Sequence, residues 1–144
     1  RSKVMGKPAM KKEERVLLYQ FPTEQISLAQ EVLRTLGIRV QILPADAWRE
    51  KVGYLLGRKG FKASSIQSTD VFEFPHRLIL FENIQGKRLT KILEALQDAG
   101  VPRITYKSAI TPYNTLWTLR YLCEHMAREH APSAQGSGGE GDIG

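Results

Sequence analysis

The stretch VLLYQFPTEQISLAQEVLRTLGIRVQI, residues 16–42, decides the fold because the same pattern occurs a second time in the chain. It begins with a short apolar run at 16–19, continues with apolar residues at helical spacing up to Gly37, and ends in the alternating segment 38–42. This pattern predicts a buried strand, an amphipathic helix closed by a glycine and a half-buried strand. Thr23 is expected to cap the helix.

Residues 78–107, LILFENIQGKRLTKILEALQDAGVPRITYK, repeat this order of elements. An apolar run is followed by a helical stripe up to Gly100 and by an alternating segment at 101–107. The distance from Leu17 to Gly37 is twenty residues, and that from Ile79 to Gly100 is twenty-one. The repeat therefore predicts two equivalent βαβ units.

The character of each strand indicates its place in the sheet. The first and third are continuously apolar, as is typical of central strands covered on both faces. The second and fourth alternate and include Arg39 and Lys107, which edge strands tolerate. We therefore expect an α/β (α+β) fold of ferredoxin-like type, a four-stranded sheet in the order 4-1-3-2. Pro102 lacks an N–H, which suits the start of an edge strand.

A last helix is expected to cover the sheet face that a ferredoxin-like fold leaves open. Thr111 would be its N-cap and Pro112 its first residue. Its apolar stripe, widened by Trp117 and Tyr121, consists of Leu116, Leu119, Leu122, Cys123 and Met126. The prediction that both faces of the central strands are covered depends on this helix.

The connection between the second and third strands, 44–75, is long for a loop and is a place where function is often found. A short inserted helix is expected there, capped by Asp46 and ended by Gly57. Its apolar face would consist of Trp48, Val52, Leu55 and Leu56. The polar stretch 58–70 predicts no regular structure.

Composition predicts one domain at 15–131, between disordered segments at 1–14 and 132–144. The net charge is +6, with a pI near 9.6, which favours anionic partners and solubility equally. The single cysteine, Cys123, fits a reducing compartment. No apolar run approaches the roughly 20 residues of a membrane span, and no signal peptide is evident. We expect a cytoplasmic protein without a membrane partner.

Two candidate ligand sites lie in the inserted segment. In Gly57-Arg58-Lys59-Gly60, two glycines flank two cations and could offer N–H groups and charge to a phosphate. The alternative is a helix-closing glycine followed by a solvated turn. Gly53, beside Tyr54, costs roughly 1 kcal/mol within a helix relative to Ala, so close packing or a ligand is expected there.

A third candidate is the strand-to-helix junction 107–117. Lys107, Thr111 and Asn114 could bind an anion at a helix N-terminus, with Trp117 beside them. The alternative is capping by Thr111 and Asn114, with Trp117 in the core. The combined hypothesis is an anion or peptide pocket between segment 53–60 and the helix that begins near Thr111.

The sequence contains no recognisable set of catalytic residues. Its acidic residues suggest no general acid–base pair, and the spacings among Cys123, His125 and His130 do not suit a zinc site on a helix. We therefore expect no metal and no cofactor. Cys123 is expected in the core rather than as a nucleophile. An enzyme that uses Lys107 or Cys123 is the weakest of three hypotheses.

Three segments resemble the Domain of Unknown Function 3783 family of small bacterial proteins: VLLY at 16–19, VGYLLG at 52–57 and KSAITPYNTLW at 107–117. The likeness covers about residues 15–131. Ser108 departs from the alanine expected there, and 58–75 matches less closely. The resemblance implies a cytoplasmic protein of anaerobic bacteria, and it supplies no activity, cofactor or site residue.

Two functional hypotheses of different class follow. The leading one is a non-enzymatic binding or regulatory module that uses the pocket described above. The alternative is a nucleic-acid-binding protein whose basic surface consists of Arg49, Lys51, Arg58, Lys59 and Lys62. A homodimer formed through edge strands is a further expectation about partners.

Overall fold

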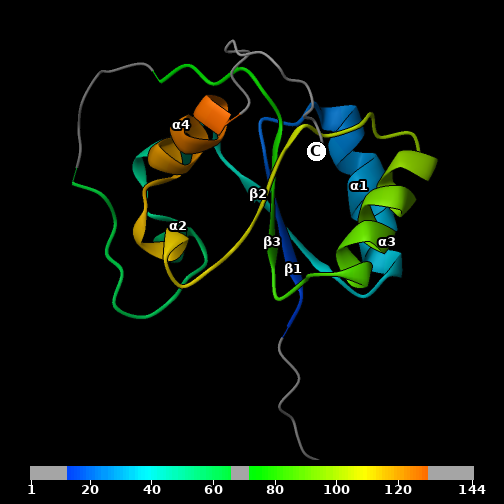
Figure 1. Cartoon of the computed structure of the whole chain (residues 1–144), viewed down its shortest axis with the longest axis horizontal. Coiled ribbons are helices and arrows are strands. Elements are labelled where there is room, and N and C mark those ends of the chain that lie inside the picture. The colour runs from blue at the N-terminus through cyan, green and yellow to red at the C-terminus, as the bar shows by residue number, and fades with distance from the viewer. Residues whose placement is uncertain (1–12, 66–71, 130–144) are drawn as a thin grey trace, which may run out of the picture.

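The two continuously apolar strands lie side by side at the centre of a four-stranded mixed sheet (Figure 1). The computed structural model describes residues 13–65 and 72–129. The sheet consists of β1 (Arg15–Tyr19), β2 (Arg39–Leu43), β3 (Leu78–Glu82) and β4 (Tyr106–Ala109). Strands β1 and β3 are antiparallel, whereas β2 runs parallel to β1 and β4 parallel to β3. The α+β class, the two βαβ units and the central position of the first and third strands are confirmed.

The neighbours of the edge strands differ from the expected order. The order 4-1-3-2 would place β4 beside β1 and β2 beside β3, but the observed order is β2-β1-β3-β4. Each edge strand therefore pairs with the central strand of its own βαβ unit, and the ferredoxin-like arrangement is not confirmed. The physical reason is that polarity and alternation separate central from edge strands, but they carry no information about which central strand an edge strand joins.

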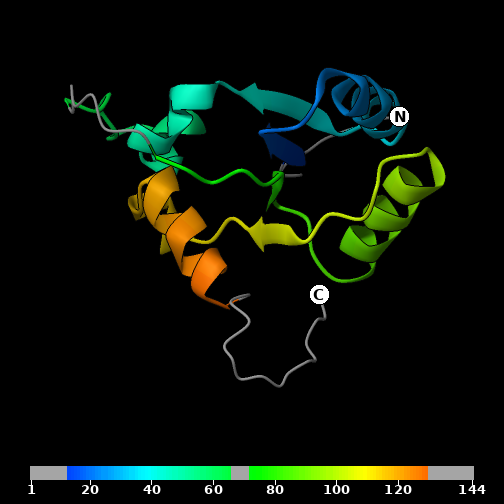
Figure 2. The same ribbon diagram turned by 90° about the horizontal axis from the view of Figure 1, so that it is seen from above.

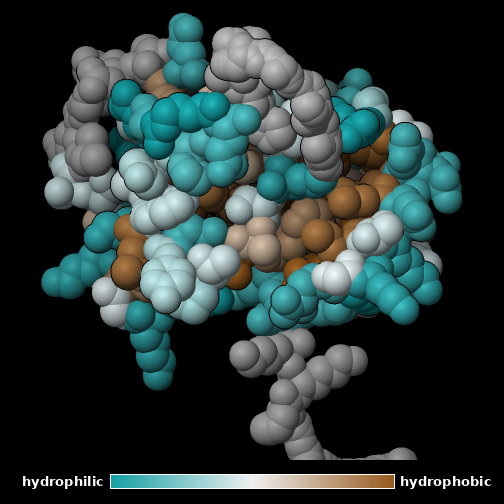
Figure 3. Space-filling model, in the orientation of Figure 1, coloured by the Kyte–Doolittle hydropathy of each residue, from teal (hydrophilic) through white to brown (hydrophobic). Residues whose placement is uncertain are grey.

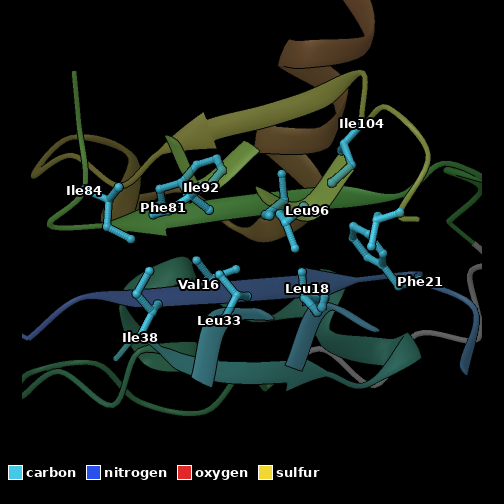
Figure 4. Close-up of a cluster of buried hydrophobic side chains, with 13 residues drawn as sticks. Val16, Leu18, Phe21, Leu33, Ile38, Phe81, Ile84, Ile92, Leu96 and Ile104 are labelled. Carbon is cyan, nitrogen blue, oxygen red and sulfur yellow. The ribbon is translucent and has the colours of Figure 1, made fainter. Parts of the chain in front are cut away.

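Both faces of the central strands are covered, as predicted (Figure 2). On one face, Val16, Leu18, Ile79 and Phe81 pack against α1 (Thr23–Thr35) and α3 (Lys87–Asp98) (Figure 4). On the other face, Leu17, Tyr19, Leu78 and Leu80 pack against the layer that contains α4 (Leu119–Glu129). These eight side chains are at most 2% exposed, so the sheet lies between two separate apolar cores.

The inserted helix is interrupted. A 3₁₀ helix, η1 (Ala45–Arg49), and one turn of α-helix, α2 (Val52–Leu55), replace the single helix expected after Asp46. Between them, Glu50 and Lys51 are extended because this backbone pairs with a distant segment. Asp46 lies inside η1 and is not its cap, whereas Gly57 closes α2 as expected, with φ +77°.

The predicted last helix is also divided. A short 3₁₀ turn, η2 (Asn114–Leu116), precedes α4, and Thr118 rather than Thr111 caps α4, since its Oγ1 accepts a hydrogen bond from the Tyr121 N–H. Leu116 is 61% exposed and does not belong to the apolar stripe. Leu119, Leu122, Cys123 and Met126 are buried against the sheet as predicted, whereas Tyr121, expected to widen the stripe, is 44% exposed.

Two other boundaries differ. The fourth strand begins at Tyr106 rather than near Pro102, since residues 101–105 form no ladder and instead bury Val101 and Ile104 in the core with α1 and α3. Thr23 is the first residue of α1 and makes no side-chain cap, since Pro22 occupies the N-cap position.

The predicted disordered segments 1–14 and 132–144 lie outside the described residues, apart from Glu13 and Glu14. These two acids pair with Arg39 and Arg88, at 3.0 and 2.8 Å. Of the predicted irregular stretch 58–70, residues 58–65 contain no helix or strand, and 66–70 lie outside the described residues. Across 13–65 and 72–129, no helix is both long and apolar enough to cross a bilayer.

Candidate ligand-binding site

Two segments distant in sequence meet at the end of α2. The Val52 N–H donates to the Trp117 carbonyl, and the Leu119 N–H donates to the Glu50 carbonyl, both at 2.8 Å. These bonds make an antiparallel bridge between Lys51 and Thr118. The inserted segment and the segment that leads into α4 thus lie side by side, where the sequence hypothesis placed a pocket.

A hollow of about 630 Å³ lies beside this bridge. Among the residues that the structure describes, four of its lining side chains are cations and none carries a carboxylate. The lining consists of Arg49, Lys51, Lys59, Gly60, Phe61, Lys62, Ala63, Ser64, Ser65, Leu116 and Thr118. The hollow therefore combines positive charge with two large apolar side chains, Phe61 and Leu116.

The loop that forms one wall is anchored at two points. The Ser64 N–H donates to Glu50 Oε1 at 2.7 Å. Phe61 packs directly over Gly53, where an added Cβ would overlap the ring carbon Cζ. A glycine is required at position 53 for this contact. The close packing expected at Gly53 is therefore made with the side chain of Phe61. Gly53 itself does not line the hollow.

Arg49 is held in an unusual environment in the same wall. Its guanidinium lies over the Trp48 ring, 5.2 Å from the centroid, a cation–π contact. Its Nε is buried and has no hydrogen-bond partner among the described residues. Buried polar atoms are nearly always hydrogen-bonded, so this N–H has a donor capacity that the described protein atoms do not use.

Arg58 is directed away from the hollow, toward the end of β3. It donates to Glu82 Oε2 at 2.9 Å, while Arg15 donates to Glu82 Oε1 at 2.7 Å. Arg15 also donates to Gln41 and to the Leu56 carbonyl. This group of polar side chains joins three strands to the end of α2. The role of Arg58 is therefore to fix the turn that carries Lys59.

The charge of Glu82 is maintained by this pairing. Its side chain is 10% exposed, and burial alone would raise the pKa of its carboxyl. Hydrogen bonds from Arg58 and Arg15 outweigh burial and hold the pKa of Glu82 below its usual value. Glu82 was not singled out in the sequence, although an acid ending an apolar strand was the available signal.

Thr111 and Asn114 cap each other. The Thr111 N–H donates to Asn114 Oδ1 at 2.9 Å, and the Asn114 N–H donates to Thr111 Oγ1 at 3.1 Å. Asn114 Nδ2 donates to the Ala109 carbonyl. Their side chains follow the capping alternative and are not lining residues of the hollow. Trp117 is partly buried and packs on Tyr121, with ring centroids 4.8 Å apart.

Lys107 lies on the opposite side of the sheet. It pairs in register with Ile79, whose side chain faces α1 and α3, and its Nζ donates to the Ile104 carbonyl. It lines a separate cavity of about 240 Å³. Figure 3 shows an apolar area on the side of the molecule where α1 and α3 lie. Lys107 is therefore not part of the same site as Lys59.

Of the nine residues proposed as ligand contacts, only Lys59 lines the hollow. Tyr54 is 37% exposed but lies outside the lining, and Gly57 ends α2. The basic cluster of the nucleic-acid hypothesis corresponds better, because Arg49, Lys51 and Lys62 join Lys59 in the lining. Phe61, which no sequence motif singled out, is the main addition from the structure.

The remaining reactive groups are buried or scattered. Burial, with a smaller effect of Glu124, raises the pKa of Cys123 to about 12, so this thiol is protonated at neutral pH. Burial likewise raises the pKa of Tyr19 to about 12, with smaller effects from Cys123 and Asp46. Over residues 13–65 and 72–129, no three His, Cys, Asp or Glu side chains are grouped to hold a metal ion. His130 lies outside this part of the chain.

Fold and site together define a mixed-sheet α+β domain with a basic, partly apolar hollow on its α4 side. Residues 77–131 match the family model described as Domain of unknown function (DUF3783), which supports membership of this part of the chain in that family. The match runs from the start of β3 to the end of α4 and leaves 49–65 outside, so it is shorter than the expected 15–131. No curated protein and no solved structure matches the chain.

Proposed function

We propose that this protein is a non-enzymatic binding module whose hollow takes an anionic, phosphate-bearing ligand. One observation carries the proposal: Arg49, Lys51, Lys59 and Lys62 converge on a single hollow that no carboxylate of the described residues lines. Cations gathered around a concavity reinforce each other's field and attract anions. An anion fits this lining better than a neutral peptide.

The contacts around the hollow support a role in binding. The hydrogen bond that the Ser64 N–H donates to Glu50 and the packing of Phe61 on Gly53 hold the loop. The ion pair of Arg58 with Glu82 holds the turn before it. The backbone that carries the cations is therefore ordered before binding, which reduces the conformational entropy lost when a ligand binds. The described residues offer no catalytic group in the hollow beyond amines and hydroxyls. The lone cysteine supports a cytoplasmic location for this module.

Tripolyphosphate is a suitable probe, because its several charges match several cations. We expect Lys59→Glu/Lys62→Glu to weaken its binding at least tenfold, since two attractive contacts become repulsive. Calorimetric titration at low salt measures the affinity, which should fall steeply between about 50 and 200 mM salt.

The matched control is Lys87→Glu/Lys91→Glu, which makes the same charge change on exposed positions of α3, across the sheet. This control should bind the probe within about twofold of the native protein. Equal weakening in both double variants would show that net charge, and not the hollow, attracts the anion, and the proposal would then be wrong.

A further inference from the structure

The hollow is not uniformly polar. Its apolar side chains favour a ligand that has an apolar part as well as negative charge. Phe61 and Leu116 lie among the cations, and Leu116 is 61% exposed. A simple inorganic anion would leave this apolar surface unused. We infer that the ligand is a nucleotide unit with an unpaired base, its phosphates against the cations and its base against Phe61. This inference rests on the proposed function.

Phe61 is positioned to act as a stacking surface. The ring is held by its contact with Gly53, where there is no Cβ to displace it. Aromatic rings in basic grooves stack on bases of any sequence, and each stacked base adds appreciably to affinity. A ring fixed before binding loses little conformational freedom when a base arrives.

Arg49 contributes a cation of fixed position to the lining. Its guanidinium is held on Trp48 by a cation–π contact. The arginine fork binds phosphate through two parallel N–H donors.

The number of cations favours a ligand with several phosphates. A single phosphate monoester, with a charge near −2, would leave part of the charge of the four cations uncompensated. Two sources share the required chemistry: a free nucleoside triphosphate, and a single strand with consecutive phosphates. A duplex is disfavoured because its bases are stacked on each other and cannot reach Phe61.

The test compares ligands that differ only in their bases. A short oligothymidylate is compared with an abasic phosphodiester chain of equal length, and thymidine triphosphate with the 5′-triphosphate of base-free deoxyribose, by calorimetry and fluorescence anisotropy. We expect each base-bearing ligand to bind about tenfold more tightly than its base-free counterpart. Within the base-bearing pair, a tighter oligothymidylate identifies a nucleic-acid strand as the source, and a tighter triphosphate identifies a free nucleotide.

Phe61→Leu keeps an apolar side chain but removes the aromatic face. This variant should lose the tenfold preference and retain the affinity for tripolyphosphate, and Phe61→Tyr should restore the preference. Because both variants must bind tripolyphosphate, this measurement also shows that the loop is intact. Equal binding of base-bearing and base-free ligands by the native protein would overturn this inference and leave the proposed function standing. Absence of tripolyphosphate binding would instead overturn the proposed function.

Discussion

The two faces of the sheet are built differently. The side with α1 and α3 is regular: two long helices, each closed by a glycine, pack on the sheet through an apolar core. The side with α4 is irregular, with two 3₁₀ helices, a one-turn helix and a chain of aromatic rings that includes Trp48 and Phe74. The basic hollow belongs to this second side. The regular face supports the strands, and the irregular face positions the charges.

The largest expected effect on stability tests whether α4, on the irregular face, packs on the sheet as tightly as α1 does on the regular face. Leu33 in α1 and Leu122 in α4 are at most 1% exposed. Replacing either by Ala should lower the free energy of unfolding by about 3 kcal/mol, because a cavity remains on either side. Urea unfolding measures both values. A loss below about 1 kcal/mol for Leu122→Ala alone would show that α4 packs loosely on the sheet.

A smaller effect is expected from the polar group at the end of β3. Glu82→Ala should lower stability by about 2 kcal/mol at neutral pH, because Arg15, whose side chain is 16% exposed, loses its partner charge. Glu94→Ala, at an exposed position of α3, should change stability by less than about 0.5 kcal/mol.

The pH dependence gives a second test of Glu82. Its folded-state pKa is lowered by Arg58 and Arg15 despite burial, so the stabilisation is complete above the ordinary pKa of about 4.3. It is lost as the pH falls through the lowered folded value. The stability difference between native protein and Glu82→Ala should therefore be constant above about pH 5 and shrink in acid. A difference that grows in acid would contradict the assignment.

The smallest effect concerns the contact beneath the loop. Gly53→Ala should gain about 1 kcal/mol from helix propensity but lose about 2 kcal/mol by displacing Phe61, a net loss of about 1 kcal/mol. In a Phe61→Ala background, the same substitution should stabilise the protein, because the clash is absent. If Gly53→Ala still lowers the stability of the Phe61→Ala protein, the loss does not come from the contact with Phe61.

The regular face could be predicted from the sequence, and the irregular face largely could not. Periodicity and the glycines at 37 and 100 are local signals, and they identified two βαβ units and the central strands correctly. The neighbours of the edge strands depend on pairing across the whole sheet. The interruption at Glu50 and Lys51 depends on a bridge to Thr118, which no local pattern reveals.

The candidate site shows the same difference between local signals, which the sequence reveals, and long-range contacts, which it does not. The sequence placed segment 53–60 beside the segment before α4, and the structure brings them together. Strand register, which composition does not reveal, puts Lys107 on the other face. A long-range ion pair turns Arg58 toward Glu82, and local capping uses Thr111 and Asn114. The cations of the inserted segment predicted the lining of the hollow better than the nine proposed ligand contacts did.

Mapping the anion site by nuclear magnetic resonance tests the central claim most directly. Tripolyphosphate is titrated into the ¹⁵N-labelled protein, and the shifts of the backbone amides are followed. The basic hollow predicts the largest shifts within 49–65 and at 116–118, with none along α3. Shifts centred on Lys107 and α3, or spread evenly over the surface, would contradict a ligand site in the hollow.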